Sequence, residues 1–185
     1  ALITNEYMQT SDPDIYGAGD SVAVHYNPTR SLAYIPLATN AVRQGVLVGK
    51  NIEKPTVKYM GTQSSSGLKL YDKTIVSTGL TMAAAKAQNV NAHEVIVKDN
   101  YRPEFMPTTD PVLMSLVYDP DSRRILGGSL LSTYDVSQSA NTLSVCIQNN
   151  NTIDDLGMVD MLFQPQFDRP FNYLNILAQA AQEKE

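Results

Sequence analysis

The chain has 185 residues, of which 43% are hydrophobic and 18% charged, and its formal net charge is −5 at pH 7. This composition is typical of a soluble globular protein of one or two domains, and the acidic balance argues against electrostatic binding of nucleic acid. A single cysteine, Cys146, excludes an internal disulfide, and no apolar run approaches the ~20 residues of a membrane span, so we expect a cytoplasmic protein without a membrane partner.

The first fifty residues predict extended segments and one helix. Residues 1–9 are expected to be extended, and residues 14–16 to form a short buried strand that ends at the glycines of 17–19. Residues 35–52 predict a helix with Pro36 at its first position, where the missing N–H costs nothing. Small and apolar residues recur there at helical spacing and predict a stripe packed closely against a neighbour: Leu37, Ala38, Ala41, Val42, Gly45, Val46 and Gly49.

A polar connector over residues 53–66 is the expected boundary between a domain at 1–52 and a domain at 53–185. Beyond it, apolar runs bounded by turn residues predict five strands, four of them in two hairpins: 67–71 with 74–79, 111–118 with 124–132, and 93–99 alone. Helices are expected at 80–88, 137–148 and 170–184. The predicted fold class is α+β, an antiparallel-sheet domain with flanking helices, preceded by a remnant of an α/β domain.

The stretch YGAGD, residues 16–20, places a carboxylate directly after two glycines. Glycines let the backbone approach a ligand closely, and an ionised Asp20 can only accept hydrogen bonds, from ligand hydroxyls or from backbone N–H groups. Downstream, PLAT (36–39) carries no charge, so the helix start would present bare N–H groups and a positive dipole end. Together they suit a flavin nucleotide, whereas YGAGD alone is equally well explained as a plain tight turn.

These two stretches resemble the second flavin-binding motif of the pyridine nucleotide–disulfide oxidoreductase superfamily, most closely its NADH oxidase and NADH peroxidase branch. The similarity continues through GTQSSSGLKLYD, STGLT, LVYDP, ILGGSLLS, TIDDLGMVD and FQPQFDRPFN, so it covers essentially the whole chain. The resemblance implies a homodimeric FAD enzyme with NADH as its substrate. Residues 1–52 would then be the C-terminal end of the FAD-binding domain, and residues 53–185 the dimerisation domain.

The resemblance also implies roles for individual residues. Gln164-Pro165 stands where disulfide reductases carry His-Pro with an acid/base histidine, which favours oxygen or peroxide as the electron acceptor. The implied cofactor contacts are Asp20 at the ribitol, Pro36 on the nicotinamide side, Leu37, Ala38 and Thr39 at the flavin pyrimidine, and Phe163, whose backbone reaches the flavin of the partner subunit.

Other hallmarks of that branch do not occur in the sequence. There is no GxGxxG nucleotide motif, and the redox cysteine and active-site histidine of the family lie upstream of the matched region. Cys146 falls on a predicted buried helix face and is expected to be a small core residue. We therefore expect the C-terminal portion of an NADH oxidase that passes electrons from NADH through FAD to oxygen, by way of a cysteine sulfenate upstream. The isolated chain is expected to contain no catalytic residue, to bind no FAD and to be inactive.

Alternatives remain open at this point. The alternative enzymes are an NADH peroxidase and a coenzyme A disulfide reductase. The alternative that is not an enzyme is a non-catalytic dimerisation module. The missing catalytic residues favour this module, whereas the stretches YGAGD and IPLATNA argue against it. No metal site is expected, because His25 and His93 lack a second ligand at suitable spacing, and Asp155 is placed to cap a helix together with Thr152.

Overall fold

The computed structural model describes all 185 residues and divides them into two compact units, Ala1–Ser64 and Ser65–Glu185. The division falls later than the boundary at 52/53 that the sequence predicts. The reason is that the connector is hydrogen bonded within the first unit: the Tyr59 N–H donates to the Glu6 carbonyl at 2.7 Å, and the Thr62 N–H to the His25 carbonyl at 2.9 Å. The connector is therefore part of the first unit.

The first unit contains the short 3-10 helix η1 (Gly19–Ser21), strands β1 (Val24–Tyr26) and β2 (Ser31–Ala33), and helix α1 (Ala38–Asn51). Strands β1 and β2 pair antiparallel, and two isolated parallel bridges join Leu2 to Val22 and Tyr26 to Thr62. The predicted buried strand at 14–16 is wrong. The chain turns back there, so that Tyr16 makes a single antiparallel bridge with Gln9 and Ile15 is 53% exposed.

Helix α1 differs from its prediction in two ways. It begins at Ala38 with Leu37 as an extended N-cap, so Pro36 precedes the helix instead of occupying its first position. The small-residue stripe is not packed within this chain around Gly45 and Gly49, because nothing lies within 4 Å of a Cβ built at either glycine. The buried residues of the helix are polar instead: Asn40, Gln44 and Asn51.

Asn51 explains why a polar face can be buried. Its side-chain Nδ2 donates to the carbonyls of Tyr7 (3.3 Å) and Val57 (2.8 Å), and its Oδ1 accepts the N–H groups of Thr56 and Val57, both at 2.9 Å. This amide therefore satisfies four backbone groups of irregular segments, which would lack partners in an apolar environment.

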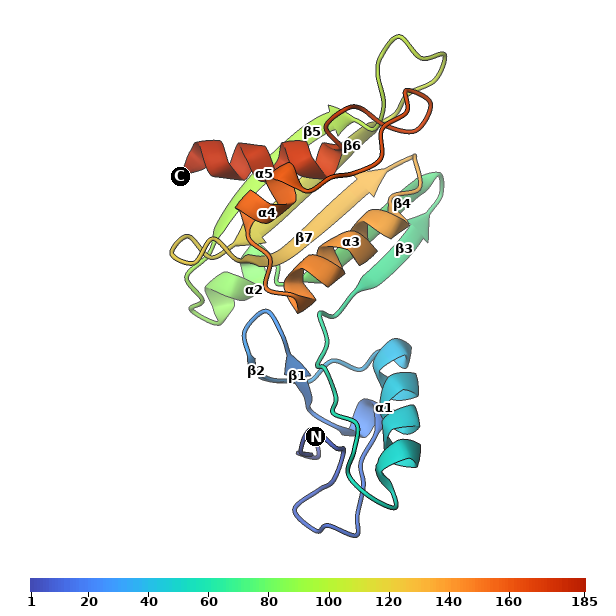
Figure 1. Cartoon of the computed structure of the whole chain (residues 1–185), viewed down its shortest axis with the longest axis vertical. Coiled ribbons are helices and arrows are strands. Elements are labelled where there is room, and N and C mark those ends of the chain that lie inside the picture. The colour runs from blue at the N-terminus through green and yellow to red at the C-terminus, as the bar shows by residue number, and fades with distance from the viewer. The chain divides into compact units, whose positions relative to one another are not determined.

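The second unit is built on one five-stranded antiparallel sheet (Figure 1). Its strands, in the spatial order β3-β4-β7-β6-β5, are β3 (Ser66–Leu70), β4 (Lys73–Gly79), β7 (Ile125–Ser132), β6 (Pro111–Tyr118) and β5 (His93–Asn100). The two predicted hairpins are confirmed as β3–β4 and β6–β7. The pairing of β5 with β6, across the intervening loop 101–110, was not predicted.

Helices α3 (Ser137–Gln148) and α5 (Tyr173–Lys184) cover one face of the sheet, with α4 (Ile153–Met158) packed against α5 (Figure 1). The short helix α2 (Met82–Ala87) connects β4 to β5. The core lies between sheet and helices, where Met114, Leu130 and Leu143 are at most 1% exposed. A Cβ on Gly128 of β7 would lie 2.7 Å from Leu143 Cδ1, so a glycine at this position lets α3 approach the sheet.

Apolar side chains are exposed on the other face of the sheet. Leu68, Ile96 and Leu113 lie on it and are 57%, 63% and 44% exposed. The predicted capping box of α4 is confirmed, since Thr152 accepts the N–H of Asp155 and the Asp155 carboxylate accepts the N–H of Thr152. The mixture of helices and antiparallel sheet agrees with the predicted fold class.

We predict that Leu143→Ala destabilises the second unit by about 2–5 kcal/mol, because it leaves a cavity beneath α3. Urea unfolding followed by far-UV circular dichroism measures this loss. Val145→Ala is the matched control: Val145 lies on the same helix, is 58% exposed, and its truncation should change stability by less than about 0.5 kcal/mol. Equal losses in the two variants would contradict the assignment of Leu143 to the core.

Candidate functional site

Asp20 lies in η1 with an exposed side chain. Its carboxylate makes no ion pair and accepts no hydrogen bond within the chain, so both oxygens are available to a ligand. The preceding Gly19 has a φ of +76°, in the left-handed region that favours glycine. The glycine therefore permits the turn that presents the carboxylate.

The start of α1 has the character that the sequence predicts, although it lies at Ala38. Leu37 makes no side-chain capping bond, and the first turn contains no acidic residue. The Leu37 carbonyl accepts the N–H groups of Asn40 and Ala41 at 2.9 and 3.0 Å, whereas those of Ala38 and Thr39 have no acceptor within the helix. Ala38 and Thr39 are exposed, so this end of the helix can receive an anionic or hydrogen-bond-accepting group.

The structure brings the Gly-Asp turn against α1. The Gly19 N–H donates to Gln44 Oε1 at 2.7 Å, and a Cβ built on Gly19 would lie 3.6 Å from the Cβ of Ala41. In the sequence, the turn and the helix are linked only by their spacing, and no role was predicted for Gln44. Its one local signal is that an amide stands between the apolar residues of a helix.

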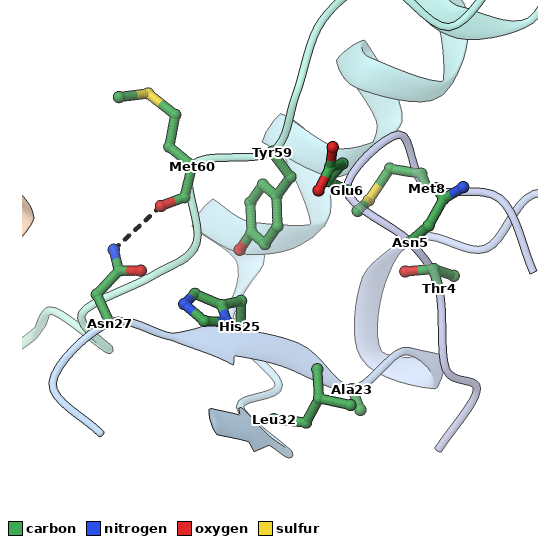
Figure 2. A pocket seen from close by; sticks show the side chains of 10 residues that line it. All are labelled: Thr4, Asn5, Glu6, Met8, Ala23, His25, Asn27, Leu32, Tyr59 and Met60. Carbon is green, nitrogen blue, oxygen red and sulfur yellow. Dashed lines mark hydrogen bonds between the residues drawn. The ribbon is translucent and has the colours of Figure 1, made fainter. Parts of the chain in front are cut away.

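A pocket of about 430 Å³ lies elsewhere in the first unit (Figure 2). In Figure 2, Tyr59 points from the connector towards His25 on β1, and Asn27 Nδ2 donates to the Met60 carbonyl at 3.1 Å. Burial raises the pKa of Tyr59, and the neighbouring Gln44 amide partly opposes this shift. None of the predicted site residues lines the pocket, whose lining is Thr4, Asn5, Glu6, Met8, Ala23, His25, Asn27, Leu32, Tyr59 and Met60.

Phe163 belongs to the second unit, in the segment 159–172 between α4 and α5, and is 49% exposed. The next residues form a tight turn in which Gln164 Oε1 accepts the Gln166 N–H at 2.7 Å. The Gln164 carbonyl accepts the N–H groups of Phe167 (2.7 Å) and Asp168 (2.9 Å). The Gln164 side chain thus supports the local backbone, and an amide does not titrate as a histidine would.

Side chains from elsewhere in the second unit hold this segment in place. Arg102, in the loop between β5 and β6, donates from Nη1 to the Gln166 carbonyl at 2.9 Å. Arg169 pairs with Asp99 of β5 at 2.8 Å. Asp168 is only 5% exposed, and burial raises the pKa of its carboxyl. No local pattern in the sequence predicts these roles of Arg102 and Asp168.

The segment is also rich in exposed apolar side chains. Leu162 is 71% exposed, Phe167 63% and Phe171 47%. A concentration of exposed apolar residues on one ordered segment is typical of an interaction surface.

The remaining candidates from the sequence have structural explanations. Cys146 is partly buried against the hydrophobic core, and burial raises its pKa, so it is a core residue as predicted. His25 is exposed on β1, and His93 Nδ1 lies 2.6 Å from Glu185 Oε1. No group of three His, Cys, Asp or Glu side chains is arranged to hold a metal ion. None of the helices combines the length and apolarity that crossing a membrane requires.

Comparison with known proteins identifies the family. Residues 66–173 match the dimerisation domain of the pyridine nucleotide-disulphide oxidoreductases. An NADH oxidase from Enterococcus faecalis is 58% identical over 183 residues, which are 99% of this chain and 41% of that protein. The structure of a water-forming NADH oxidase from Lactobacillus brevis bound to NADH has a TM-score of 0.98 and 80% identity, covering 100% of this chain and 41% of that one. A coenzyme A disulfide reductase from Staphylococcus epidermidis is 25% identical, over 96% of this chain and 40% of that protein.

The chain therefore belongs to the pyridine nucleotide-disulphide oxidoreductase family. It spans about two fifths of the length of the curated relatives that it matches.

We predict that Arg102→Met loosens residues 159–172, the Phe163 segment, because it removes a charge-assisted hydrogen bond to the Gln166 carbonyl. A bond to a charged group is worth about 1.5–3 kcal/mol, so amide exchange over residues 162–168 should accelerate about tenfold or more. Hydrogen-exchange mass spectrometry measures this rate, with α3 as the internal reference. Lys98→Met, which removes an exposed cation from β5, is the control; equal acceleration in both variants would contradict the proposed tether.

Proposed function

We propose that this chain is the C-terminal part of an FAD-dependent NADH oxidase, which transfers hydride from NADH to FAD and electrons to oxygen. The observation that carries the proposal is the 80% identity, along the entire chain, with a water-forming NADH oxidase. The 58% identity with a second NADH oxidase supports it. In this proposal, the first unit is the end of the FAD-binding domain, the second unit is the dimerisation domain, and the product is water.

The residues of the first unit fit the proposed cofactor. The free carboxylate of Asp20 suits the hydroxyls of ribitol, and the N–H groups at the start of α1, around Leu37, Ala38 and Thr39, suit the pyrimidine edge of the flavin. Pro36 would lie on the nicotinamide side. Bound FAD would supply the hydride-accepting chemistry, while this chain would bind the ribitol and favour negative charge on the ring.

The exposed stripe of α1 supports the same proposal. Val42 and Val46 are 68% and 54% exposed, and the adjacent Gly45 and Gly49 leave room for another backbone to approach. A helix usually buries such a stripe. We infer that the remainder of an FAD-binding domain covers it in the complete enzyme, and we expect the isolated chain to hold no FAD.

We also propose that the enzyme is a homodimer. The family name of the second unit, a dimerisation domain, supports this, as do the exposed apolar residues of the Phe163 segment. The backbone of Phe163 would reach the flavin of the partner subunit. The proposed partners are otherwise small molecules, NADH and oxygen, in the cytoplasm; the net charge of −5 speaks against nucleic acid.

An NADH peroxidase would use the same contacts in this part of the chain and remains the alternative enzyme. The lower identity with a coenzyme A disulfide reductase, 25%, makes that activity a weaker candidate. A non-catalytic dimerisation module would not require the Gly-Asp turn or the uncapped start of α1.

We predict that Asp20→Ala in the full-length enzyme raises the dissociation constant for FAD about tenfold or more, because each hydrogen bond to a charged group is worth about 1.5–3 kcal/mol. Titration of the apoenzyme with FAD, followed by flavin fluorescence, measures this constant. Asp14→Ala is the matched control, since Asp14 is an exposed carboxylate of the same unit. Unchanged affinity in Asp20→Ala would overturn the proposed contact.

We predict that the full-length enzyme consumes oxygen and NADH without accumulating hydrogen peroxide. Reduction of oxygen to water uses twice as much NADH per oxygen as reduction to peroxide, so an oxygen electrode combined with NADH absorbance identifies the product. Oxidation of NADH that requires added peroxide and consumes no oxygen would favour the peroxidase instead.

A further inference from the structure

The buried face of α1 connects the two segments that carry the proposed FAD contacts. Asn40 and Gln44 lie one helical turn apart on this face and are 2% and 0% exposed. Asn40 Nδ2 donates to the Ile35 carbonyl at 3.1 Å, immediately before Pro36. Gln44 Oε1 accepts the Gly19 N–H at 2.7 Å, immediately before Asp20. Each amide thus holds the backbone next to one half of the proposed site.

Burial of the Gln44 side chain is unfavourable by itself. Its Nε2 lies near the hydroxyl of Tyr59, which Figure 2 shows beside His25, and the two groups make no hydrogen bond of normal geometry. An imperfect hydrogen bond offsets only part of the cost of burying the amide, a cost that an apolar side chain of the same size would avoid. The contact that an apolar side chain could not make is the one with the Gly19 N–H.

One residue of α1 bonds directly to the Gly19 turn, and another lies beside it. Even a Cβ built on Gly19 would make only ordinary van der Waals contact with the Cβ of Ala41, at 3.6 Å, so Ala41 leaves the turn unobstructed. Gln44, three residues further along the same face, fixes the direction of the Gly19 N–H. Because the exposed carboxylate of Asp20 has no partner of its own within the chain, its position depends on the backbone of this turn.

We propose that Gln44 is a positioning residue for flavin binding: its hydrogen bond with Gly19 fixes the Asp20 carboxylate relative to the start of α1. This inference rests on the proposed function, in which Asp20 and Leu37–Thr39 contact one FAD molecule. A rigid spacing between the two contacts lowers the entropy lost when the cofactor binds. Gln44 itself need not touch the cofactor.

A double-mutant cycle in the full-length flavoenzyme tests the inference, with FAD dissociation constants of Gln44→Met, Asp20→Ala and the double variant. We expect Gln44→Met to raise the dissociation constant about tenfold alone but less than about threefold in the Asp20→Ala background, because Gln44 acts through Asp20. The visible circular dichroism of the bound flavin should change in Gln44→Met. Gln44→Glu keeps an accepting oxygen and should restore the dissociation constant to within about threefold of wild type.

A structural control separates positioning from general loss of stability. Val24 of β1 is 2% exposed, and Val24→Ala weakens the first unit without removing a contact of Gly19. Its dissociation constant for FAD should stay within about threefold of wild type. Should Gln44→Met fail to fold, Gln44→Asn takes its place in the cycle, because this shorter amide cannot reach Gly19.

The outcomes distinguish the inference from the proposed function. Weaker binding in Asp20→Ala, combined with an unchanged constant in Gln44→Met or with additive effects in the double variant, overturns the positioning role alone. Equal weakening by Val24→Ala and Gln44→Met also overturns it. Unchanged binding in Asp20→Ala overturns the proposed FAD contact and, with it, the positioning role.

Discussion

Buried amide side chains on one helix determine the organisation of the first unit. Asn40, Gln44 and Asn51 occupy the face of α1 where apolar residues are usual, and each bonds backbone groups of another segment. These segments are irregular, so few of their N–H and carbonyl groups find partners in sheet or helix. The amides thus tie the Gly-Asp turn, the entry to α1 and part of the connector to this one helix.

The second unit follows a different principle. Its sheet buries one face beneath α3 and α5 through alternating apolar residues, and its hydrogen bonds are satisfied by the ladder of strands. This regular core provides a rigid base for an irregular segment, 159–172, which Arg102 and the Asp99–Arg169 ion pair hold at the surface. Rigid scaffolds commonly present binding residues on such segments.

The sequence predicted those helices, strands and caps correctly for which the local residue pattern agrees with the tertiary environment. The two hairpins, α3, α5 and the capping box at Thr152 follow from alternation, helical period and capping chemistry. The prediction of a buried strand at 14–16 failed because a Ser-Asp-Pro-Asp turn folds this segment back on residues 8–10, with which it makes a single bridge that leaves Ile15 exposed. The prediction that Gly45 and Gly49 pack against a neighbour was not met within this chain. The spacing of small residues identifies a packing face, but it does not show whether the partner of that face belongs to the same chain. The anchors Gln44 and Arg102 were missed because their partners are distant backbone groups. The local pattern marks Gln44 as an amide among apolar helix positions, but it does not identify the group that the amide bonds.

The chemistry of the amides on α1 has a consequence for acid tolerance. Carboxylate pairs in the second unit depend on charge: Arg123 holds the pKa of Asp154 below its usual value, so the stability from this pair is lost as the pH falls through that lowered pKa. Asparagine and glutamine do not ionise in this range. Acidification would therefore weaken ionic contacts on the sheet-bearing half before it disturbed the amide contacts around Gly19.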